Sequence, residues 1–430
     1  MQLSARLEAL IALTPEGQCV GDIGTDHGFV AVELVRRGKF ARAIASDLRR
    51  GPLRAAAEHV AEAGLSDRIA LRLGDGLSPL APGEADVLFI AGMGGALMEK
   101  ILTEGLAVAG AARYLVLSPQ SEQARFRESL MALGFVIRRE ALVEEDGKFY
   151  PLLLAEPGRE EEPWTPEELR YGRYLLRDNP MELQSLLERD VRILEQVLEA
   201  MEASVSPESR ERSREKRLEL EAARRLLVQA EQRKEEEMRR FFNRLAPGWD
   251  AAQCIDPQSL EQILEASRIR EGCRVLDVAC GTGVLIPEYL QRGAASVLGV
   301  DLAEEMLKLA EEKFAGNDKL SFLAGNAETL SYPGEYDLIM IFNAFPHFVH
   351  PDRLLTKLSA CLAPGGRLCL AHSMGRQALE AHHRGLARNV SRSFPEWEAL
   401  LELWDRTLTR EDTELTDRMI LLTGEKKPAD

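Results

Sequence analysis

The sequence predicts two α/β domains, each built on a mostly parallel seven-stranded sheet, with an antiparallel helical coiled-coil hairpin between them. Three observations predict this fold class. Short apolar segments alternate with helical patterns over residues 1–156 and again over 238–430, as in sheets covered by helices on both faces. A glycine-rich loop follows the first strand of each stretch, and the two loops lie about 255 positions apart. Residues 157–237 are instead rich in charge, with leucines at helical spacing.

The first domain is expected to end in an antiparallel pair of strands. Helical patterns such as Pro52–Ala63 and Glu122–Leu133 separate the earlier strands. No helical pattern separates Phe135–Arg138 from Tyr150–Ala155, and Asp146-Gly147 between them is a turn signal, so these two strands should pair directly. The apolar strands are expected to end near Asp22, Asp47, Leu73, Gly92, Ser118 and Leu154.

The middle segment carries two apolar seams at coiled-coil spacing. A helix start is expected at Ser206-Pro207, between the seams, because serine caps helices and proline favours the first helical position. Two seams joined by a tight turn predict a helical hairpin, although the segment can also be read as a simple spacer. The first seam is Leu187, Val191, Leu194, Leu198, Met201 and Val205, and the second is Leu220, Ala223, Leu227 and Ala230.

The last domain repeats the alternation of strands and helices. Its end, Gly424–Asp430, is interpreted as a frayed tail. The expected strands are Arg274–Val278, Ser296–Val300, Leu320–Ala324, Tyr336–Phe342 and Gly366–His372.

Charge and cysteine usage limit the partners and the compartment. The net charge of −16 divides into about −3 for residues 1–155, −5 for 156–240 and −8 for 241–430. The first segment is the least acidic, and its clustered arginines can form a face for RNA or be ordinary solvated residues. The six cysteines show no paired spacing, which argues against disulfides and zinc and fits a reducing cytosol. No apolar run is long enough to span a membrane, and the N-terminus does not resemble a signal peptide. A cytoplasmic protein without a metal or a membrane partner is expected.

The two glycine-rich loops share one pattern. They read Asp22-Ile23-Gly24-Thr25-Asp26-His27-Gly28 and Asp277-Val278-Ala279-Cys280-Gly281-Thr282-Gly283, so that Asp26 stands where the second loop has Gly281. An acid ends the second strand of each domain (Asp47 and Asp301), and a polar residue ends the third (Asp75 and Asn326). Neither loop has the Gly-x-Gly-x-x-Gly spacing of nicotinamide enzymes.

This pattern is typical of class I S-adenosylmethionine methyltransferases, with one cofactor site in each domain. The acid after the second strand can accept both hydrogen bonds of a ribose diol, and the third polar residue can contact the adenine amino group. The expected cofactor-binding residues are Asp22, Gly24, His27, Gly28, Asp47, Asp75, Gly76, Gly92 and Gly94 in the first domain, and Asp277, Ala279, Gly281, Gly283, Asp301, Asn326, Ala327 and Asn343 in the second.

Residues 1–235 resemble the bacterial tRNA (adenine-22-N1)-methyltransferases. The resemblance rests on the Asp22–Gly28 loop and on the runs Gly74–Leu77, Ile90–Gly95 and Glu145–Tyr150. It implies a Rossmann-like catalytic domain followed by a helical domain that docks tRNA, with Asp26 as catalytic base or orienting group.

The roles of two loop residues in this resemblance stay open. Asp26 can instead cap its own loop, and His27 can contact a ligand or simply brace the loop.

The chain departs from the family pattern at one place. The family typically has Gln-Pro-Asn after the fifth strand, whereas this chain has Ser118-Pro119-Gln120, so Gln120 is the candidate to replace the asparagine amide.

Residues 238–430 resemble small-molecule class I methyltransferases of the ubiquinone-biosynthesis type. The resemblance rests on Val275–Gly283, Gly299–Asp301, Gly325–Glu328 and Leu362–Gly366. The aromatic segment Phe241–Asp250 stands where such enzymes carry a lid. Asn343 should face the transferred methyl group, and His347 or His372 is a candidate proton acceptor.

The sequence therefore predicts a bifunctional methyltransferase. The N-terminal module and hairpin would act on an adenine N1 of tRNA, and the C-terminal module on an unidentified small molecule. Two alternatives remain: one module is a scaffold that binds cofactor or RNA without catalysis, or both modules act on RNA. The strongly acidic C-terminal segment argues against the second alternative.

Overall fold

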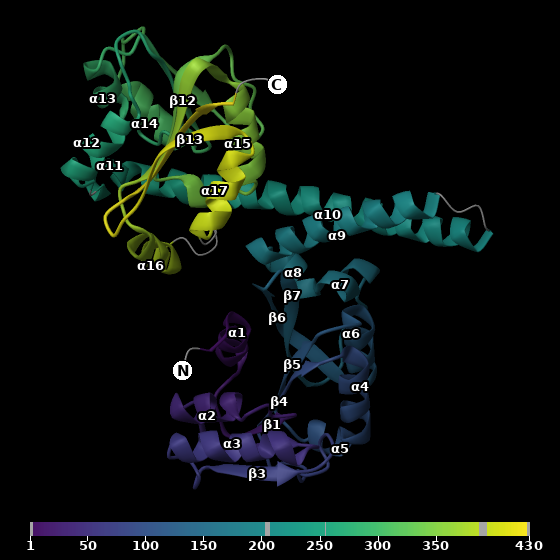
Figure 1. The fold of residues 1–430 in the computed structure, drawn as a ribbon. Helices are drawn as coiled ribbons and strands as arrows, with labels where there is room; N and C mark the ends of the chain where they lie inside the picture. Colours follow the sequence, from purple (N-terminus) through teal and green to yellow (C-terminus); the bar gives the residue numbers. More distant parts are fainter. Residues whose placement is uncertain (1–2, 203–206, 254, 387–393, 428–430) are drawn as a thin grey trace. The chain divides into compact units, whose positions relative to one another are not determined.

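The computed structural model describes residues 3–202, 207–253, 255–386 and 394–427, and it divides into two compact units (Figure 1). The N-terminal unit comprises residues 1–230 and the C-terminal unit residues 231–430. The boundary falls inside one long helix, α10 (Pro207–Leu245). The division of the chain into domains 1–156, 157–237 and 238–430 stays a prediction.

The N-terminal unit contains the expected seven-stranded sheet, in the order β3-β2-β1-β4-β5-β7-β6. The first five strands run parallel. Strand β7 pairs antiparallel with β6, as predicted, and also with β5. The strand order reverses beside β1, so the carboxyl ends of β1 and β4 border the crevice where such sheets bind ligands. The strands are β1 (Gly17–Ile23), β2 (Phe40–Asp47), β3 (Ile69–Leu73), β4 (Val87–Met93), β5 (Tyr114–Pro119), β6 (Phe135–Glu145) and β7 (Lys148–Pro157).

Helices cover both faces of this sheet (Figure 1). One buried cluster joins the sheet to α1 (Ala5–Leu13), α2 (Phe29–Arg36) and α3 (Arg50–Glu62). A second cluster joins the other face to α4 (Gly95–Glu104), α5 (Leu106–Ala109) and α6 (Gln123–Ala132). Apolar residues at alternating strand positions supply both clusters, which explains the nearly continuous apolar strands of the sequence.

Four further helices follow the sheet: α7 (Pro166–Tyr171), α8 (Arg173–Asp178), α9 (Met181–Glu202) and α10. Helix α9 packs on the first part of α10 through Leu194, Leu198, Leu220 and Ala223, all members of the two seams. Val205 and Ser206 lie outside the described residues, so the tight turn and the coiled-coil geometry stay predictions.

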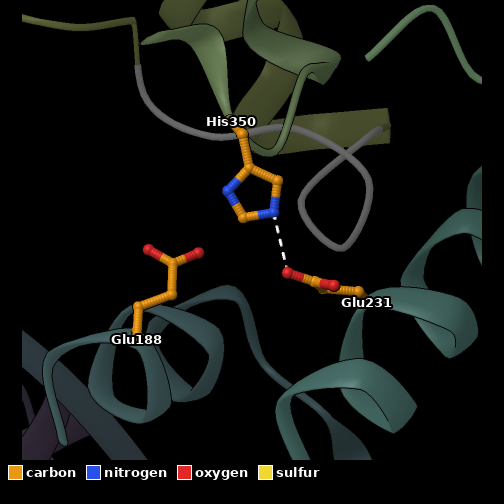
Figure 2. A group of neighbouring side chains, drawn as sticks. All are labelled: Glu188, Glu231 and His350. Carbon is orange, nitrogen blue, oxygen red and sulfur yellow. Dashed lines mark hydrogen bonds and ion pairs between the residues drawn. The ribbon is translucent and has the colours of Figure 1, made fainter. Parts of the chain in front are cut away.

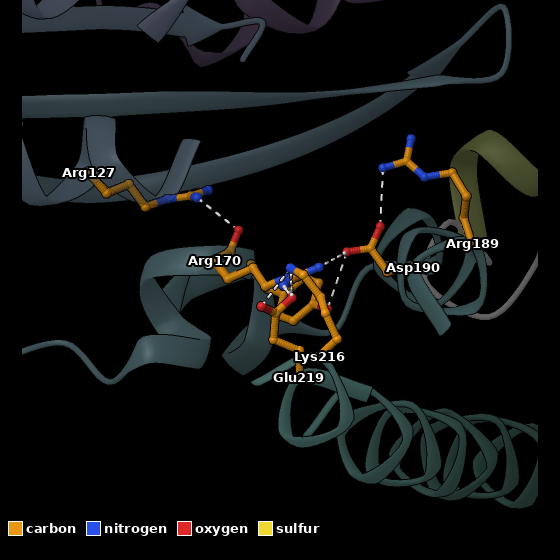
Figure 3. Close-up of polar contacts among 7 residues, drawn as sticks. Arg127, Arg170, Arg189, Asp190, Lys216 and Glu219 are labelled. Atoms are coloured by element: carbon orange, nitrogen blue, oxygen red, sulfur yellow. Dashed lines mark hydrogen bonds and ion pairs between the residues drawn. The ribbon is translucent and has the colours of Figure 1, made fainter. Parts of the chain in front are cut away.

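Ion pairs hold these helices on the sheet domain (Figure 3). Arg127 of α6 and Glu140 of β6 form a fully buried pair at 2.8 Å, and Arg127 also donates to the carbonyl oxygens of Leu169 and Arg170. The guanidinium of Arg170 in turn pairs with Asp190 of α9 at 3.0 Å and Glu219 of α10 at 2.6 Å. A chain of hydrogen bonds and ion pairs therefore runs from Arg127 to both long helices.

The C-terminal unit repeats the same sheet, in the order β10-β9-β8-β11-β12-β14-β13. Its strands are β8 (Arg274–Val278), β9 (Ser296–Asp301), β10 (Leu320–Ala324), β11 (Tyr336–Phe342), β12 (Leu362–His372), β13 (Leu408–Leu415) and β14 (Ile420–Lys426). Its helical elements after α10 are η1 (Ala246–Gly248), α11 (Trp249–Ala252), α12 (Pro257–Ala266), α13 (Ile286–Gln291), α14 (Glu304–Lys313), η2 (Phe345–His347), α15 (Pro351–Ala360), α16 (Arg376–Leu386) and α17 (Trp397–Asp405).

The interpretation of Gly424–Asp430 as a frayed tail is wrong for Gly424–Lys426. These residues end strand β14, where Gly424 pairs with Leu368 on one side and Arg410 on the other. A Cβ at Gly424 would lie 2.6 Å from the carbonyl oxygen of Thr409, so the glycine permits a close approach of strands rather than marking a loose end. None of the helices in the described part of the chain has the length and hydrophobicity that a membrane span requires.

Candidate active sites

The first loop of the N-terminal unit is fixed by its own backbone. Asp22 is buried at the end of β1, and its carboxylate accepts a 2.6 Å hydrogen bond from the Thr25 hydroxyl. The N–H groups of Gly24 and Thr25 both donate to the carbonyl oxygen of Ser46 on β2. Burial raises the pKa of Asp22 to about 6.

Gly24 suits the conformation and the close packing of this loop. Its φ of +73° is a left-handed conformation, and a Cβ there would come within 2.0 Å of the Met93 Cε atom at the end of β4. The loop after β1 therefore meets the end of β4, which places both predicted ligand-binding segments together. Met93 is not among the predicted site residues, although its side chain lies against this loop.

Asp26 is the exposed acid of this loop. Its side chain is 79% exposed, and its Oδ1 atom lies 3.4 Å from Nε2 of His27. His27 itself has a φ of +63°, which is uncommon for a residue other than glycine. An open carboxylate and an open imidazole thus stand side by side where a substrate would approach.

The other predicted residues of this unit lie at the same edge of the sheet. Asp47 ends β2, and its nearly buried carboxylate accepts the Arg49 N–H at 2.7 Å. Asp75, in the loop after β3, is exposed, and Gly76 beside it has a φ of +51°. The loop positions of Gly28 and Gly92 are also left-handed, with φ of +71° and +80°.

The loops after β4 and β5 contact one another. The Gln120 N–H donates to the Met93 carbonyl oxygen at 2.9 Å, and a Cβ at Gly94 would lie 2.9 Å from the Ser121 hydroxyl. Gln120 is exposed, whereas Ser118 is completely buried. Of the residues that depart from the Gln-Pro-Asn pattern, only Gln120 is thus positioned to meet a substrate.

In the C-terminal unit, most predicted site residues line one pocket. The empty space inside it, including the part open to solvent, is about 930 Å³. Asp277 is buried behind the pocket, and Gly283 packs against Ile286 and Phe314. The predicted residues that line the pocket are Ala279, Gly281, Asp301, Asn326, Ala327, Asn343 and His347.

Asp301 is held by backbone donors. Its Oδ2 atom accepts the Gly281 N–H and its Oδ1 atom accepts the Ala303 N–H, both at 2.8 Å. Burial raises the pKa of Asp301 to about 6. Burial also raises the pKa of Asp277 to about 8, with a further contribution from the negative charge of Asp301.

The last part of α10 and the segment after it complete this pocket. Met238, Phe242 and Trp249 belong to its lining. Glu235 accepts a 3.0 Å hydrogen bond from the Asn326 amide, and Glu231 pairs with His350 at 2.9 Å (Figure 2).

Sequence reasoning missed Glu231 and Glu235. Both belong to a run of charged residues that resembles an ordinary solvated helix face, and their partners lie 119 and 91 positions away. Asp250 further holds the covering segment by accepting from the Thr282 hydroxyl and pairing with Lys313 at 2.7 Å.

The histidine candidates occupy different surroundings. His347, in η2, lines the pocket with its ring 5.0 Å from that of Phe242. His372 is completely buried at the end of β12, edge-on to Phe394. Asn343 has a φ of +53°, and its amide bonds the Ser373 hydroxyl at 2.9 Å. Of these three residues, His347 and Asn343 line the pocket and His372 does not.

Both sites fit a nucleoside-bearing cofactor. Each has a carboxylate at the end of the second strand, a left-handed loop that brings backbone close, and a polar residue after the third strand. These are donors and acceptors for a ribose and an adenine, at the crevice where the strand order reverses.

Comparisons with known proteins agree with this geometry. Residues 3–153 match a methyltransferase domain family, and residues 275–366 match a second methyltransferase domain family. The chain is 38% identical over 158 residues to the tRNA (adenine(22)-N(1))-methyltransferase of Bacillus subtilis, covering 37% of this chain and 66% of that protein. It is 33% identical over 139 residues to the ubiquinone biosynthesis O-methyltransferase of Bordetella avium, covering 30% of this chain and 57% of that protein.

Among solved structures, an uncharacterised protein of Listeria monocytogenes is 28% identical with a TM-score of 0.51, covering 53% of this chain and all of that chain. The chain spans just under two thirds of the length of the Bacillus subtilis relative and little more than half of the length of the Bordetella avium relative. The chain carries two class I S-adenosylmethionine-dependent methyltransferase domains, and its N-terminal region is similar to the tRNA (adenine(22)-N(1))-methyltransferase of Bacillus subtilis.

Proposed function

We propose that the N-terminal unit transfers a methyl group from S-adenosylmethionine to N1 of an adenine in tRNA, at position 22 as in the name of the Bacillus subtilis relative. The observation that carries this proposal is the exposed carboxylate of Asp26, in a loop where the second domain has glycine. Substrates of this kind also make the cytoplasm the proposed location.

The residues of this site suit methylation of a ring nitrogen. Adenine N1 carries an in-plane lone pair, so the protein has mainly to align it with the methyl group that S-adenosylmethionine supplies. The new N–C bond leaves the ring positively charged, and the Asp26 carboxylate is placed to stabilise that charge. The exposed amide of Gln120 is proposed to orient the base, and His27 to support Asp26.

The helical hairpin is the proposed docking element for tRNA. Exposed arginines along α9 and α10 can contact phosphates, although acidic residues are interspersed. In the sheet domain, Arg36 and Arg37 are occupied by Glu33 and Glu8, so these cations are already neutralised. The exposed arginines of the hairpin include Arg192, Arg212 and Arg214, whereas Arg224 and Arg225 pair with Glu195 and Glu167.

The test uses two tRNA transcripts that differ only at position 22. The chain should form 1-methyladenosine on the transcript with adenine there and none on the transcript with guanine. Equal methylation of both would place the target elsewhere, and no 1-methyladenosine on either would refute the proposed substrate.

The C-terminal unit is proposed to methylate a small, uncharged and largely apolar molecule. Among the described residues that line its pocket, the charged ones are Asp301 and Glu328, while Phe242, Trp249 and Phe348 are aromatic. A pocket with acids and no lysine or arginine in this lining would disfavour acceptors that carry a net negative charge. His347 is the proposed proton acceptor.

The rival readings can be separated by titration with S-adenosylmethionine. Two molecules bound per chain, and one after Asp301→Ala, would support two cofactor sites. One molecule bound by the wild-type chain would favour a scaffold role for one unit. RNA methylation that persists after Asp26→Ala and disappears after Asp301→Ala would show that the C-terminal unit acts on RNA.

A further inference from the structure

Three aromatic rings gather beside the first cofactor loop. His27 belongs to the loop, Phe29 begins α2, and His59 comes from α3. The ring centroids of Phe29 and His59 lie 4.6 Å apart, and those of His27 and Phe29 lie 5.7 Å apart with planes only 24° from parallel. The His27 and His59 centroids are 6.0 Å apart.

His59 is tied to this group by a hydrogen bond as well as by ring contact. Its Nδ1 atom lies 2.8 Å from the carbonyl oxygen of His27, the residue with the left-handed backbone. The His27 side chain remains 48% exposed, and its Nε2 atom is 3.4 Å from Asp26. The ring group therefore presents open surface directly next to the proposed catalytic carboxylate.

We propose that His27, Phe29 and His59 form a platform on which an unpaired nucleobase of the RNA substrate stacks. Proteins that take bases out of a helix hold them on aromatic faces, because every base offers a flat π surface. The three rings already pack on one another, so the base would lie on their outer face. This proposal rests on the proposed tRNA substrate.

Charge at the same edge supports an RNA ligand. Arg49 and Arg50 follow β2, the strand whose Ser46 carbonyl anchors the loop. The Arg49 side chain is 76% exposed, and its Nε atom lies 3.8 Å from Oδ1 of Asp47, which is a long distance for an ion pair. Cations at the same edge of the sheet can contact the phosphate of a base that stacks on the aromatic rings.

The experiment separates stacking from bracing by substituting His59 in the full chain. His59→Phe keeps a ring and loses the bond to His27. His59→Asn keeps a polar group at the position of Nδ1 and loses the ring, and His59→Ala loses both. Ala57→Ser, at an exposed position of α3, is the matched control. Affinity for unmodified tRNA is measured in the presence of S-adenosylhomocysteine, and methylation kinetics are measured alongside.

The platform predicts that His59→Asn and His59→Ala weaken tRNA binding by about tenfold, the effect of losing one stacked base. His59→Phe and Ala57→Ser should stay within about twofold of wild type, with cofactor affinity unchanged in all variants. Normal binding by His59→Asn together with a loss in His59→Phe would overturn the platform in favour of bracing. If the wild-type chain fails to methylate tRNA, the proposed function is refuted, and this result is distinct from a change in binding among the His59 variants.

Discussion

Asp277 shows how a single buried acid makes stability depend on pH. Its pKa rises from an ordinary 3.8 to about 8 because it is buried near Asp301. Between these pH values the folded chain holds a proton that the unfolded chain releases, so this group lowers stability as pH rises, by up to about 1.4 kcal/mol per pH unit.

Replacing Asp277 by asparagine should remove that contribution. We expect the C-terminal unit of Asp277→Asn to lose less stability than wild type between pH 5 and pH 8, measured by urea unfolding without cofactor. Asp337→Asn is the control: pairing with Arg274 lowers the pKa of Asp337, so its contribution changes only in more acidic solution. The same pH dependence in Asp277→Asn and wild type would contradict the assigned protonation.

Gly24 and Ala279 occupy matching left-handed positions, with φ of +73° and +58°. Gly24→Ala adds a methyl group within 2.0 Å of Met93 Cε and imposes backbone strain of about 1–2 kcal/mol. Its N-terminal site should bind S-adenosylmethionine at least about tenfold more weakly. Ala279→Gly relieves strain and should leave the C-terminal site intact. Calorimetric titration of both variants checks this, and an unaffected Gly24→Ala would show that the loop adjusts.

Sequence reasoning indicated that the candidate residues share one edge of the sheet, but it did not indicate all of their surroundings. The order of Asp22, Asp47 and Asp75 along the chain indicates their common edge, because successive parallel strands end there. The bond between Asn326 and Glu235 could not be predicted, since it joins a loop to a helix 91 positions earlier. The burial of Ser118 likewise depends on packing that its neighbours in sequence do not reveal.

At the scale of elements, the buried pair of Arg127 and Glu140 joins α6 to β6. Arg127→Leu would leave the Glu140 carboxylate buried without its cation, which costs about 3–5 kcal/mol in comparable proteins. We expect a loss of this size in the unfolding free energy of the N-terminal unit, measured by urea denaturation.

Two further variants test the cause. Arg127→Met combined with Glu140→Leu should recover much of the loss, because no unpaired charge remains. Arg224→Leu, which removes a pair with Glu195 whose side chains are 57% and 45% exposed, should cost less than about 1 kcal/mol. A similar loss from Arg127→Leu and Arg224→Leu would contradict the role assigned to burial.

Several strands with a strong apolar pattern were predicted closely, but the buried strand β14 (Ile420–Lys426) and the exposed strand β13 were not. Arg274–Val278 and Tyr336–Phe342 match β8 and β11, which are buried between helices. Strand β13 reads Leu-Thr-Arg-Glu-Asp-Thr-Glu-Leu and was not predicted, because it lies at the sheet edge with mostly exposed, charged side chains. Pairing with β14, rather than an apolar pattern, defines it.

At the scale of the molecule, the two units should respond differently to salt. If tRNA binding uses two or more phosphate contacts, the affinity for tRNA should fall at least about tenfold between 50 and 200 mM salt, because bound counterions are released. Binding of S-adenosylmethionine to the C-terminal pocket, where no lysine or arginine is among the described lining residues, should change little. Fluorescence anisotropy with labelled tRNA and calorimetry with the cofactor check both, and salt-independent tRNA binding would contradict phosphate recognition.

The central claim is that one chain carries two methyltransferase sites and that the first acts on tRNA. The most direct measurement is methyl transfer from labelled S-adenosylmethionine to unmodified total tRNA, followed by nucleoside analysis, for wild type, Asp26→Ala and Asp301→Ala. The account predicts 1-methyladenosine with wild type and Asp301→Ala, and its loss with Asp26→Ala. Formation of 1-methyladenosine by Asp26→Ala but not by Asp301→Ala, or none with wild type, would contradict it.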